Sequence, residues 1–263
     1  MLNYKWGIAG ILLFLVHGLS VTAQVDIPEL VTDRPDQTES ATTVPNNSLQ
    51  IETGYVFQSD EIVNGSLHST AYNTTLLRFG LLENTEIRLG FEYLGEKFIP
   101  DQGDQITQVG FSPLYAGFKI RFAEEQGWLP EMAFLPSISM PFTADEYYRI
   151  DYVSPSMRLA FSHTLSSNSG IGYNLAIEWD GKQLEPVYKY TVAYGFGLTP
   201  ALGMFIEAYG GWGENYPFDL RADTGFTLLL MSNFQFDLAG GVGITDSSPD
   251  YFVGFGFSFR IPH

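Results

Sequence analysis

Apolar and polar residues alternate along most of this chain. In the segment 85–96, for example, Ile87 and Leu89 alternate with Glu86 and Arg88. Successive side chains of a β-strand point to opposite faces, so this pattern predicts strands that have one apolar and one polar face. The same alternation defines twelve segments: 49–58, 67–81, 85–96, 105–122, 129–140, 151–164, 169–180, 186–198, 202–212, 220–230, 234–244 and 250–261.

The charged residues of these segments fall on the polar faces. There are sixteen, eight basic and eight acidic: Glu52, Arg78, Glu86, Arg88, Glu92, Lys119, Arg121, Glu131, Arg158, Glu178, Lys189, Glu207, Arg221, Asp223, Asp237 and Arg260. A charge on the lipid face of a transmembrane barrel costs about 2–4 kcal/mol at the bilayer midplane. We therefore expect the apolar faces to meet hydrocarbon and these charges to line an enclosed, nearly neutral lumen.

The connections between the segments also alternate. Longer loops follow odd-numbered segments, as at Ser59–Ser66, Lys97–Asp104 and Gly213–Asp219, whereas tight turns such as Leu82–Asn84 and Met231–Asn233 follow most even-numbered ones. Short periplasmic turns and longer external loops are typical of outer-membrane barrels. A secreted β-sandwich would share the strand alternation. The turn rhythm favours an all-β, closed, antiparallel up-and-down transmembrane barrel of about 12 strands over residues 49–263.

The N-terminus has the layout of a secretory signal peptide. Lys5 precedes an apolar stretch, Trp6–Leu19, and Val21–Ala23 supplies small residues before a cleavage site. The stretch is shorter than the roughly 20 residues of a membrane-spanning helix. We expect cleavage after Ala23, export, and residence in the bacterial outer membrane, with outer-membrane lipid and the barrel-insertion machinery as partners.

Residues 24–48 are rich in Pro, Thr, Asp and Asn, which predicts irregular chain on the periplasmic side of the first strand. Four charged residues of this segment, Asp33, Arg34, Asp36 and Glu39, are candidates for a plug or gate that enters the lumen. The simpler alternative is that the segment hangs free. The sequence does not separate the two.

Composition narrows the remaining classes of function. Loss of Lys5 leaves 12 basic against 30 acidic residues, a net charge of −18, which would repel nucleic acid. The absence of cysteine excludes disulfides, thiolate catalysis and sulfur-ligated metals. No cluster of His and Asp suggests another metal site, and no phosphate-binding loop suggests a nucleotide, so we expect no metal and no cofactor.

Catalytic patterns are weak. His68 lies near Ser66 and Ser69, but no motif supports a nucleophile and base, and a solvated loop histidine explains it better. The neighbouring Arg221 and Asp223 predict a lumen ion pair rather than catalytic groups. We therefore expect no catalytic residues, with an outer-membrane hydrolase as the third-ranked function.

Two regions carry a resemblance to a known family. Thr32–Ser40 followed by Leu49–Gly54 resembles the start of outer-membrane barrels named for a meta-pathway of phenol degradation, often described as transporters. Arg78–Gly90 and Leu198–Glu207 are similar to two tight hairpins of that family. The resemblance spans the mature chain and implies a barrel with a transport role, without naming a solute.

The sequence thus predicts passive passage of small molecules, with hydrophobic or aromatic ones as an option, through a narrow charged lumen. The alternative is a closed structural or adhesion barrel that binds partners through acidic external loops, because a barrel of this size can be filled by its own side chains. Solute identity, oligomeric state and whether the lumen is open or plugged stay undetermined.

Overall fold

The computed structural model describes residues 28–261, so the expected signal peptide and its cleavage site after Ala23 lie outside the described residues. It contains a single sheet in which every pairing is antiparallel. The strands are β1 (Leu49–Ile62), β2 (Gly65–Leu82), β3 (Thr85–Pro100), β4 (Ile106–Phe111), β5 (Leu114–Ala123), β6 (Glu131–Met140), β7 (Ser154–Ser166), β8 (Ser169–Glu178), β9 (Val187–Gly197), β10 (Leu202–Gly213), β11 (Tyr216–Met231), β12 (Phe234–Gly243) and β13 (Tyr251–Ile261).

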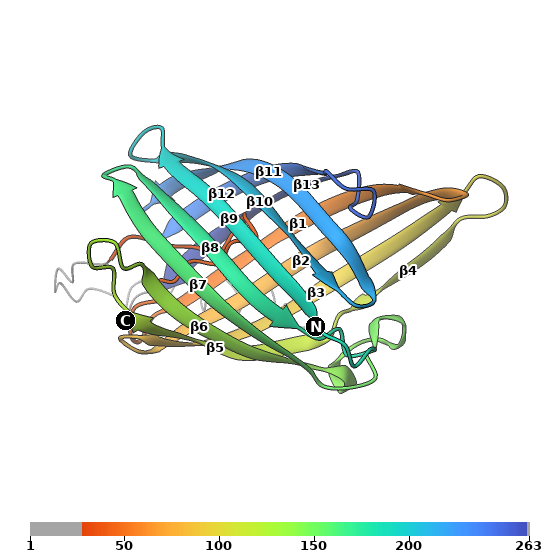
Figure 1. Ribbon diagram of the computed structural model, residues 1–263, viewed down its shortest axis with the longest axis horizontal. Coiled ribbons are helices and arrows are strands. Elements are labelled where there is room, and N and C mark those ends of the chain that lie inside the picture. Colours follow the sequence, from red (N-terminus) through yellow and green to blue (C-terminus); the bar gives the residue numbers. More distant parts are fainter. Residues whose placement is uncertain (1–27, 262–263) are drawn as a thin grey trace, which may run out of the picture.

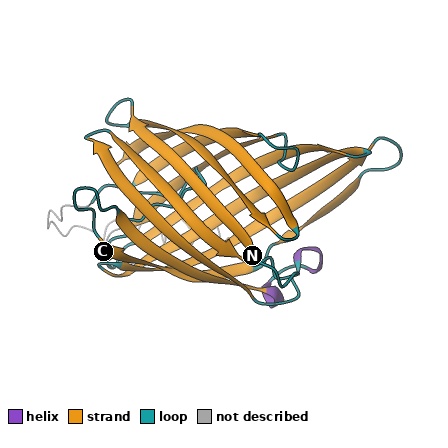
Figure 2. Ribbon diagram, viewed as in Figure 1, coloured by secondary structure: helices purple, strands orange, loops and turns teal. Residues whose placement is uncertain are grey.

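The sheet closes on itself. β1 pairs with β13 on one edge and with β2 on the other, and β2 pairs in turn with β3, so the ribbon forms a complete barrel (Figures 1 and 2). β4 and β5 both pair with β3, one after the other, and are separated by Ser112 and Pro113. Proline has no N–H for the ladder, which accounts for the break. These two segments are one interrupted strand, so the predicted 12-strand closed antiparallel barrel is confirmed.

The barrel is apolar outside and charged inside. On β13, Phe255 and Phe257 are exposed on the outer face, whereas Gly256, Ser258 and Arg260 between and after them are buried. Arg78, Lys119, Glu52 and Glu86 are among the largest fully buried side chains of the described part of the chain. No helix within residues 28–261 is long and apolar enough to cross a membrane.

The two ends of the barrel differ, although less than the sequence suggested. The predicted loops Ser59–Ser66 and Gly213–Asp219 are wrong, because the flanking strands continue into two-residue connections, 63–64 and 214–215. Asn64 adopts a positive φ of 68° before Gly65, as a tight hairpin requires. The longest connection, between β6 and β7, carries two short 3-10 helices, η1 (Pro141–Thr143) and η2 (Glu146–Tyr148) (Figure 2). We call this the loop end; the opposite end, with the turns that follow β2, β7, β9 and β11, is the turn end.

Residues 28–48, the N-terminal segment, form no helix or strand and run inside the barrel. Their hydrogen-bond partners lie in turn on several different strands. Carbonyl groups near the start of the segment bind Arg260 on β13, residues in its middle bind Glu207 on β10 and Asn174 on β8, and Val44 near its end binds Glu86 on β3. The segment therefore passes across the lumen before it enters β1.

A charged lumen crossed by the N-terminal segment

One side of the barrel wall carries a buried cluster of charges. Arg78 on β2 lies 2.8 Å from carboxylate oxygens of both Glu86 on β3 and Glu52 on β1. Arg88 on β3 and Lys119 on β5 lie in the same cluster, and no side chain in it is more than 4% exposed. The wall alone thus brings three cations against two carboxylates. A buried charge without a partner is strongly destabilising, so this side of the wall requires a further anion.

Asp33 of the N-terminal segment supplies that anion. Its Oδ2 lies 2.6 Å from Nη1 of Arg88, 2.8 Å from Nζ of Lys119 and 3.1 Å from Nη1 of Arg78. Burial by itself would raise the pKa of Asp33, but the three cations outweigh it and hold that pKa well below its ordinary value. The segment is therefore fixed to this wall by an ionised carboxylate that completes the charge balance.

Arg34 contacts the adjoining part of the wall, formed by β12, β13, β1 and β2. Its guanidinium donates two hydrogen bonds to Asp237 on β12, with N–O distances of 2.9 and 3.2 Å, and a third of 3.0 Å to the hydroxyl of Thr74. The space it occupies is left by Gly54 and Gly256, since a Cβ atom at either position would overlap the guanidinium. Glycine at these two positions permits the close approach, and the bidentate geometry makes the contact specific.

The next strands along the wall, β10 and β11, hold further acids that lack a cation. Glu207 on β10 accepts a 2.8 Å hydrogen bond from the backbone N–H of Gln37. Asp223 lies directly opposite Glu207 in the β10–β11 register, and both of its carboxylate oxygens are buried with no hydrogen-bond partner among residues 28–261. Burial, and then the nearby Glu207, raise the pKa of Asp36 in the N-terminal segment well above its ordinary value. These strands therefore concentrate carboxyl groups that have no cation partner among the described residues.

Other predicted lumen residues also lie in interior contacts. Arg158 pairs with Glu178 at 3.0 Å, and Glu39 of the N-terminal segment lies 2.6 Å from Arg88. Three more of these residues form contacts: Arg121 with Glu131 at 3.3 Å, Lys189 with the hydroxyl of Tyr216 at 3.3 Å, and Arg260 with the carbonyl of Glu29 at 3.2 Å. Glu92 has no ion pair among the described residues.

The predicted ion pair between Arg221 and Asp223 is wrong. Arg221 instead pairs with Asp219 at 2.9 Å. Both aspartates are two positions away from Arg221 on the same face of β11, so strand periodicity could not choose between them. Asp219 is the better partner because the hydroxyls of Tyr216 and Ser248 also bind it.

Uncharged residues that hold the N-terminal segment escaped the sequence analysis, which followed charges. Asn174 on β8 accepts a 2.8 Å hydrogen bond from the N–H of Glu39 and donates one of 2.9 Å to its carbonyl. Thr191 on β9 shares a 2.7 Å hydrogen bond with Thr38. Asn174 and Thr191 occupy inward positions of their strands, and that parity was the available signal.

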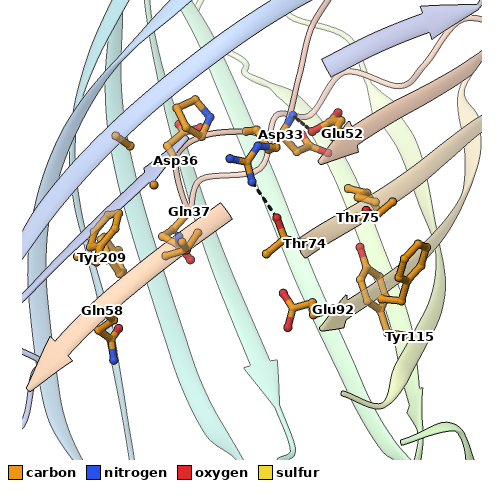
Figure 3. A pocket seen from close by; sticks show the side chains of 18 of the residues that line it. Asp33, Asp36, Gln37, Glu52, Gln58, Thr74, Thr75, Glu92, Tyr115 and Tyr209 are labelled. Atoms are coloured by element: carbon orange, nitrogen blue, oxygen red, sulfur yellow. Dashed lines mark hydrogen bonds between the residues drawn. The ribbon is translucent and has the colours of Figure 1, made fainter. Parts of the chain in front are cut away.

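The N-terminal segment lies between two cavities of the interior. The cavity toward the loop end has a volume of about 370 Å³ and is lined by Gln58, Glu92 and Tyr115 among others (Figure 3). The cavity toward the turn end has a volume of about 940 Å³ and includes the inward-facing Gly195. Within residues 28–261, three residues line both cavities: Arg34, Pro35 and Asp36.

The structure offers little for catalysis. The ring of His68 packs edge-on against Phe57, with centroids 5.5 Å apart, and no hydrogen bond between that imidazole and an acid or a serine is present within residues 28–261. In the same part of the chain, no group of three His, Asp or Glu residues has an arrangement that could hold a metal ion.

The comparisons with known proteins agree with this architecture. The family model described as "Putative MetA-pathway of phenol degradation" matches residues 32–261. The chain belongs to this family. The predicted family resemblance is confirmed, and the matched region includes Asp33, Arg34 and Asp36 as well as every strand. No curated protein matches the sequence.

Solved structures similar to this member of the phenol-degradation family are outer-membrane barrels. An outer-membrane channel from Pseudomonas putida F1 is 10% identical, with a TM-score of 0.64 over 84% of this chain and 98% of the other. The KdgM porin is 10% identical, with a TM-score of 0.52 over 81% and 99%. The translocator domain of the autotransporter NalP from Neisseria meningitidis is 11% identical, with a TM-score of 0.53 over 82% and 89%. At these identities the likeness shows the fold, which is that of a bacterial outer-membrane barrel.

Proposed function

We propose that this protein allows passive passage of small molecules across the bacterial outer membrane, and that the N-terminal segment gates the lumen. The observation that carries the proposal is the pair of cavities, about 370 and 940 Å³, which meet only at Arg34, Pro35 and Asp36. A continuous route would result if this short stretch moved aside, because both cavities already exist on either side of it.

The charge arrangement supports a segment that seats and leaves reversibly. Asp33 and Arg34 hold it by ion pairs to different strands of the wall, whereas Asp36 lies near Glu207 and Asp223 and opposes seating. Because the repulsive contacts offset the attractive ones within one short stretch, the seated segment is stabilised less than its ion pairs alone would stabilise it. Water and ions that enter the lumen would reduce it further, because they screen charge pairs.

The family description and the porins among the similar structures favour passage over the alternatives. The description mentions phenol degradation, which makes small aromatic molecules reasonable first solutes to test. The second candidate is a closed barrel that binds partners through its acidic loops. It is favoured by Arg34, Pro35 and Asp36, which lie between the two cavities and separate them. Absence of catalysis is part of the proposal, and the packing of His68 against Phe57 without an acid or serine partner among residues 28–261 supports it.

Conductance of the purified protein in planar bilayers tests the proposal. We expect small currents from the full protein and larger ones after deletion of Val31–Ser40, because the deletion removes every residue shared by the two cavities. Deletion of Gln102–Asp104, in the exposed connection between β3 and β4, is the matched control and should leave the current unchanged. Heat-modifiable electrophoretic mobility would check that each variant folds. A folded deletion variant that carries no current would refute passage and favour the closed barrel.

A further inference from the structure

The cavity toward the loop end contains a carboxylate without a counter-ion. Glu92 on β3 points into this cavity, across from Gln58 and Thr74 (Figure 3). Its side chain is exposed to the cavity, and it forms no salt bridge or side-chain hydrogen bond within residues 28–261. Glu86, the acid of β3 that lies nearer the turn end, is by contrast paired with Arg78.

The cations that line the same cavity are already engaged. Arg34 pairs with Asp237 at 2.9 Å, and Arg221 pairs with Asp219 at 2.9 Å. Two of the lining acids, Asp33 and Glu52, are likewise neutralised, in this case by Arg78 at 3.1 and 2.8 Å. The charges left without a partner in this lining are therefore negative.

A second observation points the same way. Asp223 on β11, two positions from the lining residue Arg221, is 93% buried, and neither of its carboxylate oxygens has a hydrogen-bond partner among the described residues. Asp36 in the floor lies close enough to feel its charge. Glu92 and Asp36 in the lining, and Asp223 close to Asp36, therefore have no cation partner among the described residues.

The remaining lining fits an organic cation better than a bare ion. Tyr115 and Tyr209 supply aromatic rings, and Gln58, Thr74 and Thr75 supply hydrogen-bonding groups (Figure 3). Ammonium and guanidinium groups are attracted to the faces of aromatic rings as well as to carboxylates. A volume of about 370 Å³ lies at the lower end of the range for small-ligand sites.

We infer that the cavity lined by Glu92 is a binding site for small organic cations, such as primary amines that carry a ring, with Glu92 as the counter-ion. The site is a stopping point on the route of the proposed passage and so rests on that function. The amine would lie against Glu92, with its ring toward Tyr115. Neutral molecules of the same shape lack the electrostatic contribution, and organic anions would be repelled.

Isothermal titration calorimetry on the full detergent-solubilised protein tests the site without reference to passage. Benzylamine and benzyl alcohol serve as a matched pair that differs in charge. We expect benzylamine to bind at least about five-fold more tightly, because a unit charge about 4 Å away in water-like surroundings changes a binding constant by that factor. Glu92→Gln should remove the difference. Glu83→Gln, the same change in the exposed turn between β2 and β3, should preserve it.

The outcomes separate this inference from the proposed function. Equal binding of amine and alcohol, no binding of the amine, or an unchanged preference in Glu92→Gln would overturn the cation site. The comparison of the two probes uses the unaltered protein, so it decides the matter even if Glu92→Gln folds poorly. Loss of bilayer current in the folded deletion variant would refute passage while calorimetry still reports on the site.

Discussion

Substitution of Asp33 by asparagine should release the N-terminal segment from the lumen. Asparagine keeps the size of the side chain but removes the charge that neutralises Arg78, Arg88 and Lys119. Removing one partner from a buried ion pair costs about 3–5 kcal/mol. The lower figure, about 3 kcal/mol, corresponds to roughly a hundredfold loss of the seated state relative to the displaced one.

Thiol labelling gives a direct assay because the protein has no cysteine. Ala41 is fully buried against Ala133, Leu135 and Ala160, so Ala41→Cys should react with a maleimide only when the segment leaves its seat. Cysteine is a small apolar residue and suits that position.

In the Asp33→Asn background the labelling rate should rise roughly a hundredfold, together with the single-channel conductance. Asp36→Asn is the matched control, since it makes the same change of side chain three residues away, where no cation is paired with the carboxyl group; labelling should not accelerate. The reasoning fails if Asp33→Asn folds and yet labels at the original rate, because the segment would then be held by something other than this cluster.

Two further predictions concern the lumen. Gly195→Trp should lower the conductance of the Val31–Ser40 deletion variant roughly twofold, because the position opens into the 940 Å³ cavity. Folding should be little affected, since a Cβ atom there meets no atom within 4 Å. Equal conductance would mean that the cavity is not on the route. The seated segment should loosen as pH rises from about 4, the ordinary pKa of an aspartate, through the raised pKa of Asp36. Seating is favoured while Asp36 is protonated and disfavoured once it ionises beside Glu207 and Asp223. Conductance measured between pH 5 and 9 should therefore increase, and Asp36→Asn should flatten the profile; an equally steep profile in that variant would exclude Asp36 as the titrating group.

Periodicity was sufficient to predict the barrel because a strand between hydrocarbon and a polar lumen must alternate. The segments 85–96 and 250–261 differ from β3 and β13 only at their ends. The hairpin at Ser59–Ser66 was predicted as a loop because its residues are polar, although Asn64 and Gly65 are the usual residues of a tight turn. Polar strand ends that extend beyond a membrane cannot be separated from loops by hydropathy alone.

The lumen was harder to predict, because parity states which face a side chain takes but not what it touches. Inward placement follows from the pattern for Arg221, whereas its choice of Asp219 over Asp223 depends on the neighbouring Tyr216 and Ser248. The position of the N-terminal segment was left open for a related reason. Asp33 and Arg34 have no periodic context, so only the wall that they meet shows why they are held.

The distribution of charge around the wall explains that fit. The sixteen wall charges balance in number, yet Arg78, Arg88 and Lys119 gather on β2, β3 and β5, while three acids gather on β10, β11 and β12: Glu207, Asp223 and Asp237. A neutral total would therefore still leave a field across the lumen. Asp33 meets the cations on β2, β3 and β5, whereas the next residue, Arg34, meets Asp237 on β12. The order of these two residues, rather than their net charge, is what matches the segment to the barrel.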